Sequence, residues 1–214
     1  MGSRWLRYAP LVWGVSLLGC ASQPPPSTNP FAVVKTDAGG FLLPEQAAYD
    51  VQHYDLALSV DPDSQSIAGT LTMRARVLEP LDVLVLDLTS DLTVEATRLV
   101  GPVGTEHDLR FRHEDSRIWV TLNRSHLAGE TVQVAVDYGG TPRVAPLPPW
   151  VGGFTWSKSE SDVPWIGVSC QVDGADLWWP CKEHPSDEPD SGVSLHYTVP
   201  ESLVVPANGL LEGI

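Results

Sequence analysis

The sequence has few basic residues: 13 lysines and arginines stand against 27 aspartates and glutamates, which gives a formal net charge of −14. No basic stripe is available to neutralise phosphates, so the composition excludes nucleic-acid binding and disfavours adhesion to anionic lipid. The sequence also lacks a phosphate-binding G-x-x-x-x-G-K-[ST] loop, a G-x-G-x-x-G dinucleotide motif and a G-x-S-x-G nucleophile elbow. The chain therefore holds no complete active site of these kinds.

Windows with helical spacing of apolar residues are missing as well, and alternation with a period of two dominates instead. Residues 54–60 and 67–77 alternate on either side of the turn-forming stretch 61–66, which predicts a hairpin. The stretch LDVLVLDL at 81–88 is apolar on both faces, which predicts a central strand. Further alternation over 109–138 completes the prediction of an all-β fold, an antiparallel and saddle-like β-sandwich.

The C-terminal part of the sequence predicts one more strand over 194–199, followed by a hairpin. Asn208-Gly209 is the strongest two-residue signal for a hairpin turn, but the returning strand has only residues 210–214. We therefore expect the sequence to be part of a longer chain, truncated at the C-terminal end of this domain.

The N-terminus has the features of an export signal. Arg4 and Arg7 precede the apolar stretch 11–18, which is too short to span a bilayer, and the segment ends in Leu-Leu-Gly-Cys20. This ending resembles a bacterial lipobox, whose cysteine is acylated, and acyl chains contribute about 0.8 kcal/mol per buried methylene to membrane binding. An ordinary cleaved signal is the alternative.

This interpretation divides the chain into three parts: a lipoprotein signal peptide (1–19), an acylated Cys20 with a Pro- and Ser-rich tether (20–44), and a β domain (45–214). It predicts a bacterial cell-envelope protein that is lipid-anchored and faces the periplasm or the exterior. Such a compartment permits disulfides, so Cys170 and Cys181 are a candidate pair, although sequence spacing does not show that their geometry allows a bond.

Two stretches deserve a test as metal sites. HEDSR (113–117) is one residue away from HExxH, but Arg117 does not ligate a metal and the flanks alternate like strands, so we expect a β-turn there. In the loop around 184–190, one histidine and three acids could hold a cation. The spacing fits neither zinc nor calcium, and solvated loop acids are the favoured interpretation; the residues are His184, Asp187, Glu188 and Asp190.

Five segments, taken in order, resemble the N-terminal domain of zinc aminopeptidases of the aminopeptidase N and leukotriene hydrolase family. They are VQHYDLALSVDPDSQSIAGTLTMRARVLEPLDVLVLDL, VAVDYGGTP, GGFTW, CQVDGADLWWPCKEHPSDEPDS and YTVPESLVVPANG, and the resemblance as a whole extends over roughly residues 49–209. The resemblance implies an all-β domain that precedes a zinc-containing catalytic domain of the same chain. The HExxH and G-x-M-E-N motifs of that catalytic domain do not occur in this sequence.

The resemblance also implies a substrate-binding residue, because the family's N-terminal domain lends one Gln or Glu to the active-site wall. The matching residue is Gln171, whose amide oxygen would accept hydrogen bonds from the protonated amine of a peptide. The alternative is that Gln171 caps backbone groups at the end of a strand. We expect Trp178, Trp179 and Pro180 to pack this loop against the sheet and a neighbouring domain, and the acids Asp187, Glu188 and Asp190 to cap backbone N–H groups.

Two functions follow as hypotheses. The first is the substrate-wall domain of a membrane-anchored zinc aminopeptidase that removes N-terminal residues from peptides; this segment alone, without the zinc site, is expected to be inactive. The second is a non-catalytic β-domain lipoprotein that acts as a peptide- or protein-binding module. A third and weaker idea, a metal-scavenging lipoprotein, is disfavoured by the lack of metal-ligand spacing.

Overall fold

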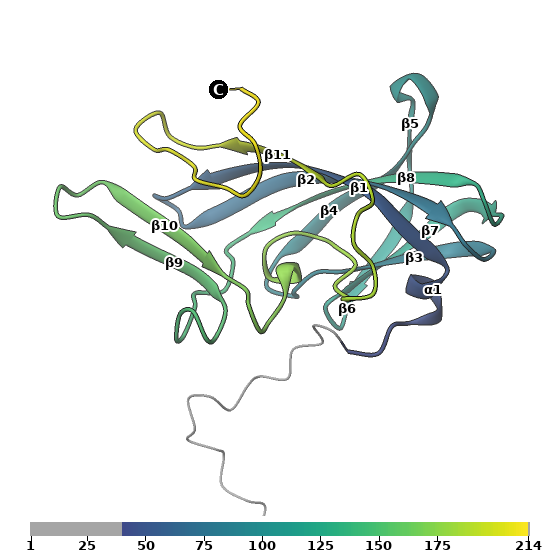
Figure 1. The fold of residues 1–214 in the computed structure, drawn as a ribbon, viewed down its shortest axis with the longest axis horizontal. Helices are drawn as coiled ribbons and strands as arrows, with labels where there is room; N and C mark the ends of the chain where they lie inside the picture. The colour runs from purple at the N-terminus through teal and green to yellow at the C-terminus, as the bar shows by residue number, and fades with distance from the viewer. Residues whose placement is uncertain (1–39, 214) are drawn as a thin grey trace, which may run out of the picture. The chain divides into compact units, whose positions relative to one another are not determined.

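The computed structural model describes residues 40–213, which contain eleven strands, one short helix (α1, Pro44–Ala47) and two single 3-10 turns, η1 (Pro102–Gly104) and η2 (Ala175–Leu177) (Figure 1). The predicted signal peptide, Cys20 and most of the predicted tether lie outside the described residues. No helix within residues 40–213 is long and apolar enough to cross a membrane. The strands are β1 (Tyr49–Asp61), β2 (Ser66–Val77), β3 (Leu81–Asp87), β4 (Thr93–Val100), β5 (Glu106–Asp108), β6 (Arg110–Glu114), β7 (Arg117–His126), β8 (Thr131–Gly140), β9 (Gly153–Lys158), β10 (Pro164–Ser169) and β11 (Val193–Thr198).

The larger sheet has the strand order β11-β1-β2-β8-β4-β5. The predicted hairpin is confirmed: β1 and β2 pair antiparallel from Tyr49 opposite Val77 to Asp61 opposite Ser66. A side chain on Gly69 of β2 would place its Cβ 2.5 Å from the carbonyl oxygen of Ala57 on β1, so the close approach of these strands requires glycine there.

The smaller sheet has the order β3-β7-β6, and its β6–β7 hairpin contains the HEDSR stretch. Asp115 and Ser116 form the turn, both with positive φ (51° and 56°), which is the geometry of a tight hairpin. The prediction of a turn at this position is confirmed. His113 lies on β6, where its Nε2 is 3.0 Å from the carbonyl oxygen of Leu88.

The prediction that 81–88 forms a central strand is wrong. Within the described residues, β3 is an edge strand of the three-stranded sheet and pairs with β7. It is nevertheless apolar on both faces because other elements cover it: Gln46 of α1 donates to Asp87 (2.6 Å), and the backbones of Asp87 and Cys181 exchange hydrogen bonds at 2.7 and 3.0 Å. An edge strand that other elements cover is therefore apolar on both faces, and its sequence resembles that of a central strand.

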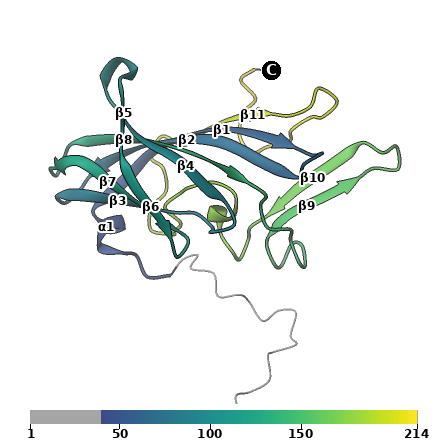
Figure 2. The same cartoon turned by 180° about the vertical axis from the view of Figure 1, so that it is seen from behind.

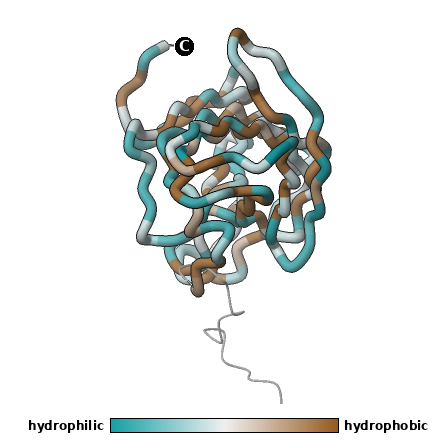
Figure 3. The backbone as a smooth tube through the Cα atoms, turned by 90° about the vertical axis from the view of Figure 1, so that its right-hand side faces the viewer, coloured by the Kyte–Doolittle hydropathy of each residue, from teal (hydrophilic) through white to brown (hydrophobic). Residues whose placement is uncertain are grey.

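The hydrophobic core lies between the two sheets, as a β-sandwich requires. Figure 3 shows apolar and polar residues alternating along the strands, which is the pattern from which the fold was predicted. The all-β, antiparallel sandwich is confirmed. Fully buried side chains come from both sheets and include Leu56, Leu71 and Met73 of the larger sheet and Leu84, Ile118 and Val120 of the smaller one.

Strands β9 and β10 form a separate two-stranded hairpin that extends beyond the sandwich (Figures 1 and 2). Phe154 is buried and stacks on the half-buried Trp156, with ring centroids 5.2 Å apart. Trp165 of β10 is 58% exposed. An isolated hairpin is marginally stable in water, so its contacts with the sandwich hold it in place.

The C-terminal part departs from the prediction in two ways. The predicted strand exists as β11, but it runs parallel to β1, from Val193 opposite Tyr54 to Thr198 opposite Ser59. The hairpin predicted at Asn208-Gly209 is wrong: residues 199–213 contain no strand. Leu210 and Leu211 are 95% and 80% exposed, so they find no apolar surface in the described residues that would support a returning strand.

Candidate functional site

The stretch predicted to border a site forms one long connection between β10 and β11, the 170–190 loop, which includes η2. Figure 1 shows this loop running along the sandwich beside β1. Leu177, Pro180 and Cys181 are buried. The loop is therefore a packed part of the domain and not a free surface segment.

The tryptophan pair packs the loop against the larger sheet. The Trp179 ring meets Tyr54 of β1 edge to face, with centroids 5.0 Å apart, and Trp178 lies 6.1 Å from Trp179. The hydroxyl of Tyr138 on β8 donates to the carbonyl oxygen of Trp178 (3.1 Å). The predicted packing against the sheet is confirmed, whereas contact with a neighbouring domain stays a prediction.

A buried ion pair fastens the second half of the loop. Lys182 and Asp187 are in contact, with side chains only 4% and 5% exposed. The Lys182 ammonium also donates to the carbonyl oxygen of Tyr49 (2.7 Å) and lies 4.7 Å from the centre of the Tyr49 ring. Asp187 accepts the backbone N–H of Val51 (3.2 Å), so this acid binds a strand, β1, and not the Pro-rich turns that we expected it to cap. Such pairs persist in a core because every charge has partners.

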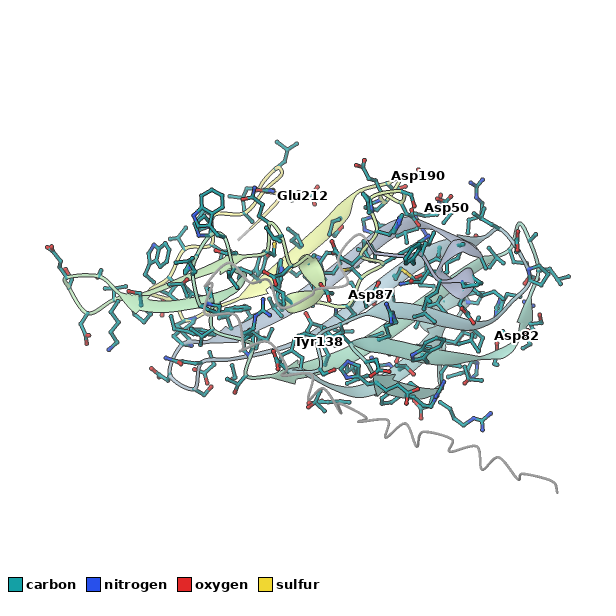
Figure 4. The ribbon with its side chains drawn as sticks, turned by 90° about the horizontal axis from the view of Figure 1, so that it is seen from below. Asp50, Asp82, Asp87, Tyr138, Asp190 and Glu212 are labelled. Carbon is teal, nitrogen blue, oxygen red and sulfur yellow. The ribbon has the colours of Figure 1, made fainter. Side chains whose placement is uncertain are left out.

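Three carboxylates lie close together: Asp87 of β3, and Asp176 and Glu183 of the loop itself. Asp87 accepts the N–H of Glu183 (3.0 Å), and Glu183 accepts the N–H of Ala175 (2.8 Å). Asp87 lies in the interior of the domain in Figure 4. Within the described residues, the buried Oδ1 of Asp176 has no hydrogen-bond partner.

The environment of Asp87 and Asp176 favours their protonated forms. Burial raises the pKa of Asp87. Burial, followed by the negative charges of Glu183 and Asp87, raises the pKa of Asp176 to about 7. One carboxyl of this cluster therefore carries a proton close to neutral pH, where an ordinary aspartate is ionised.

No group of three or more histidines, cysteines or acids in residues 40–213 has the geometry to hold a metal ion. Three of the four candidate ligands in the 184–190 stretch bind other protein groups: His184 contacts Ser186 (2.6 Å), Asp187 contacts Lys182, and Asp190 accepts from Gln52 (2.9 Å). The described residues therefore do not fit a zinc site.

Gln171 lies at the start of the loop, in a turn closed by a hydrogen bond from the N–H of Gly174 to the carbonyl oxygen of Cys170 (2.9 Å). Its side chain is exposed and makes no hydrogen bond with the residues that the structure describes. The turn itself is anchored by Asp173, which is 3% exposed and contacts Arg143 (2.7 Å) and the N–H of Gly152 (2.6 Å). The structure thus presents an unused amide on an anchored turn.

The candidate disulfide does not form in the structure. Cys170 and Cys181 are free thiols, Cys170 half-buried and Cys181 buried. The Cys181 thiol donates to Glu183 (3.4 Å), and burial raises its pKa well above the usual range, so it is held as a protonated thiol within the loop's own packing.

Sequence reasoning missed the residues that fix this loop, Lys182, Asp173 and Asp87. Each is a charged residue that is buried beside at least two partners, and these partners lie from 5 to 133 residues away along the chain. A charged residue in a polar loop is normally solvated. The one local signal that could have suggested the burial of Lys182 is its position directly after the apolar stretch Trp-Trp-Pro-Cys.

Comparison with solved structures identifies similar proteins. An M1 zinc metallopeptidase mutant from Deinococcus radiodurans, bound to a Tyr-Ser-Ala substrate, matches with 30% identity and a TM-score of 0.59, over 78% of this chain and 36% of that chain. A two-domain M1 zinc metallopeptidase mutant bound to L-arginine matches with 32% identity and a TM-score of 0.58, over 77% and 36% of the two chains. Native yeast LTA4 hydrolase matches with 22% identity and a TM-score of 0.55, over 72% and 23%, and this likeness shows the fold alone.

No protein-family model matches the sequence, and a search of curated proteins found no match either. The chain spans 36% of the length of the metallopeptidases that it matches, as one domain of such a protein would. The resemblance to the N-terminal domain of these zinc peptidases, predicted from five sequence segments, is confirmed by the structural match.

Proposed function

We propose that this chain is the N-terminal, substrate-wall domain of a zinc aminopeptidase that removes N-terminal residues from peptides outside the cytoplasm. One observation supports this most strongly: the fold and 30% of the aligned residues are shared with a metallopeptidase whose structure holds the Tyr-Ser-Ala substrate. The zinc ligands would belong to a catalytic domain of the same parent chain. The segment described here is then inactive alone, since it has no group that holds a metal within residues 40–213.

Gln171 is the residue through which this domain would touch the substrate. A protonated α-amine needs acceptors, and the exposed Gln171 amide supplies a carbonyl oxygen without a competing partner in the described residues. Accepting from the amine would orient the first peptide bond toward the zinc-bound water, whose pKa such sites lower to about 7.

The position outside the cytoplasm depends on the N-terminal signal. We propose that Cys20 is acylated and anchors the protein to a membrane of the bacterial cell envelope, with the tether separating the lipid from the β domain. Mass spectrometry of the mature protein tests this directly. A mass that corresponds to a chain beginning at Cys20 with added acyl chains supports the anchor, and a mass that corresponds to an unmodified N-terminus contradicts it.

The catalytic domain would dock on the side of the molecule that exposes apolar residues. Six large apolar side chains between residues 144 and 172 are at least 39% exposed, and the C-terminal segment 199–213 adds more. The β9–β10 hairpin and this segment lie at the same end of the domain in Figures 1 and 2. Exposed apolar groups of this extent mark interaction surfaces. The six are Val144, Trp150, Val163, Trp165, Val168 and Val172.

The test begins with the DNA downstream of the codon for Ile214. An open frame that encodes HExxH and G-x-M-E-N supports the proposal, and the protein it encodes is then assayed with peptides. We expect Gln171→Leu to lower kcat/KM by about tenfold or more, because a hydrogen bond to a charged group is lost, while Gln171→Glu keeps an acceptor and retains activity. Gln133→Leu on β8 is the matched control and should leave kcat/KM unchanged.

Two results would contradict this proposal. If Gln171→Leu and Gln133→Leu have the same kcat/KM, Gln171 does not contact the substrate. If the downstream DNA encodes neither motif, the enzyme hypothesis fails and the second hypothesis, a β-domain that binds peptides or proteins without catalysis, replaces it.

A further inference from the structure

Asp173 is at the centre of a closed ring of contacts that joins the Gln171 turn to the segment before β9. One carboxylate oxygen of Asp173 accepts from Nη2 of Arg143 (2.7 Å), and the other accepts the backbone N–H of Gly152 (2.6 Å). The Nε of Arg143 donates to the carbonyl oxygen of the same Gly152 (3.1 Å). Two charged side chains thus bind both backbone groups of one glycine.

The ring is closely packed. A Cβ on Gly152 would lie 2.5 Å from the carbonyl oxygen of Ser169, 2.7 Å from Asp173 and 2.8 Å from Leu177, so glycine alone fits there. Arg143 is itself held by the sheet, because its carbonyl oxygen accepts the N–H of Phe154 on β9 (2.8 Å). The Gln171 turn is therefore fixed to the base of the β9–β10 hairpin.

We propose that Asp173 and Arg143 are positioning residues that hold Gln171 in the orientation in which it accepts a peptide amine; this inference rests on the proposed function. The exposed Gln171 side chain has no hydrogen bond of its own in the described residues, so the order of its turn must come from neighbours. The ring supplies that order before substrate arrives, which removes part of the entropy cost of binding.

The experiment compares Asp173→Asn with a control at another partly buried ion pair. In Asp173→Asn an amide replaces the carboxylate, which removes the charge that binds Arg143 but keeps an acceptor for Gly152. The matched control is Asp137→Asn, because Asp137 of β8 pairs with Arg98 and accepts from Thr70 (2.7 Å) on the larger sheet, away from the Gln171 turn. Arg143→Lys is a third variant. Its ammonium keeps the positive charge but cannot reproduce the two hydrogen bonds that the guanidinium donates to Asp173 and to the carbonyl oxygen of Gly152.

The first readout needs no substrate. By ¹⁵N relaxation and amide hydrogen exchange we expect order parameters over 170–174 to fall from about 0.85 to below about 0.6 in Asp173→Asn. The Gly152 amide should exchange about tenfold faster or more, because its hydrogen bond then goes to a neutral acceptor and is no longer strengthened by a charge. Arg143→Lys should show a smaller loss, and Asp137→Asn none at these residues. Unchanged order and exchange in Asp173→Asn would overturn the inference.

The second readout separates this inference from the proposed function. The wild-type chain is titrated with Tyr-Ser-Ala and with its N-acetylated form while the Gln171 side-chain amide signal is followed by NMR. A shift with the free amine alone, and at least about tenfold weaker binding in Asp173→Asn, supports both proposals. If the shift occurs with the free amine but Asp173→Asn binds as tightly as the wild type, the positioning role fails and the proposed role of Gln171 stands. If no amine-dependent shift occurs in the wild type, both fail, even where the first readout shows the ring ordering the turn.

Discussion

At the scale of single residues, Lys182 shows how a charge can hold a loop. Its ammonium lies between the Tyr49 carbonyl oxygen, the Tyr49 ring and the Asp187 carboxylate, and its side chain is 4% exposed. Removing one partner of a buried pair leaves the other charge without compensation, which costs more than the pair contributes in net terms.

We therefore expect Lys182→Met to lower the free energy of unfolding by about 3–5 kcal/mol, since methionine fills the space but leaves Asp187 buried and unpaired. Urea denaturation followed by tryptophan fluorescence measures this. Lys158→Met is the control: Lys158 pairs with Asp162 at the surface, with side chains 60% and 82% exposed, and such a pair contributes at most about 1 kcal/mol. Equal denaturation midpoints for the two variants would show that the buried pair does not stabilise the loop.

Asp176 gives the molecule a dependence on pH. Its folded-state pKa is raised to about 7, whereas the unfolded chain has an ordinary aspartate near 3.9. Between these values the folded state holds a proton that the unfolded state has released, so the free energy of unfolding falls as pH rises from about 4 to about 7. Above the folded-state pKa, the full loss of unfolding free energy that results from ionising the buried Asp176 has been reached.

Asp176→Asn should remove this penalty. We expect the variant to equal the wild type near pH 4 and to be more stable at pH 8, by a few kcal/mol at most, because one pKa unit corresponds to about 1.4 kcal/mol. Thermal denaturation across this range checks it, with Asp162→Asn at an exposed surface position as the control variant. A variant less stable than the wild type at pH 8 would show that Asp176 is needed in its charged form.

At the scale of elements, period-two alternation was sufficient to predict most of the sandwich. It gave the β1–β2 hairpin and the β6–β7 turn, because alternation reports directly which face of a strand is buried. It failed where the environment of a strand depends on distant chain: β3 has the sequence of a central strand because α1 and the backbone around Cys181 cover its edge.

The direction of β11 was equally beyond local sequence. The loop before it is tied to the start of β1, since the N–H groups of Asp190 and Ser191 donate to the carbonyl oxygens of Val51 and Gln52. The chain therefore enters β11 beside the beginning of β1 and runs parallel to it. Of the candidate site, sequence could supply Gln171 through a family resemblance, but not Asp173 or Arg143, which lie 30 residues apart and meet only in the fold.

At the scale of the whole molecule, apolar exposure is distributed unevenly. The β9–β10 hairpin and its adjoining loops carry Trp150 and Trp165, which are 57% and 58% exposed, while Trp178 and Trp179 pack on the core. Trp178 and Trp179, which the sequence predicted to pack against the sheet and a neighbouring domain, therefore pack on the core of this domain, whereas Trp150 and Trp165 lie on its surface. A domain that presents such a surface to water tends to self-associate.

We expect Trp165→Ser to reduce self-association of the chain while changing the free energy of unfolding by no more than about 0.5 kcal/mol, because an exposed side chain loses little on substitution. Trp156→Ser is the matched control on the same hairpin: Trp156 packs on the core and stacks on Phe154, so its loss should cost about 3 kcal/mol or more. Sedimentation velocity gives the first quantity and urea denaturation the second. If Trp165→Ser associates as strongly as the wild type, the hairpin is not the adhesive face, and a catalytic domain would have to dock elsewhere, with the exposed C-terminal residues Leu210 and Leu211 as the next surface to substitute.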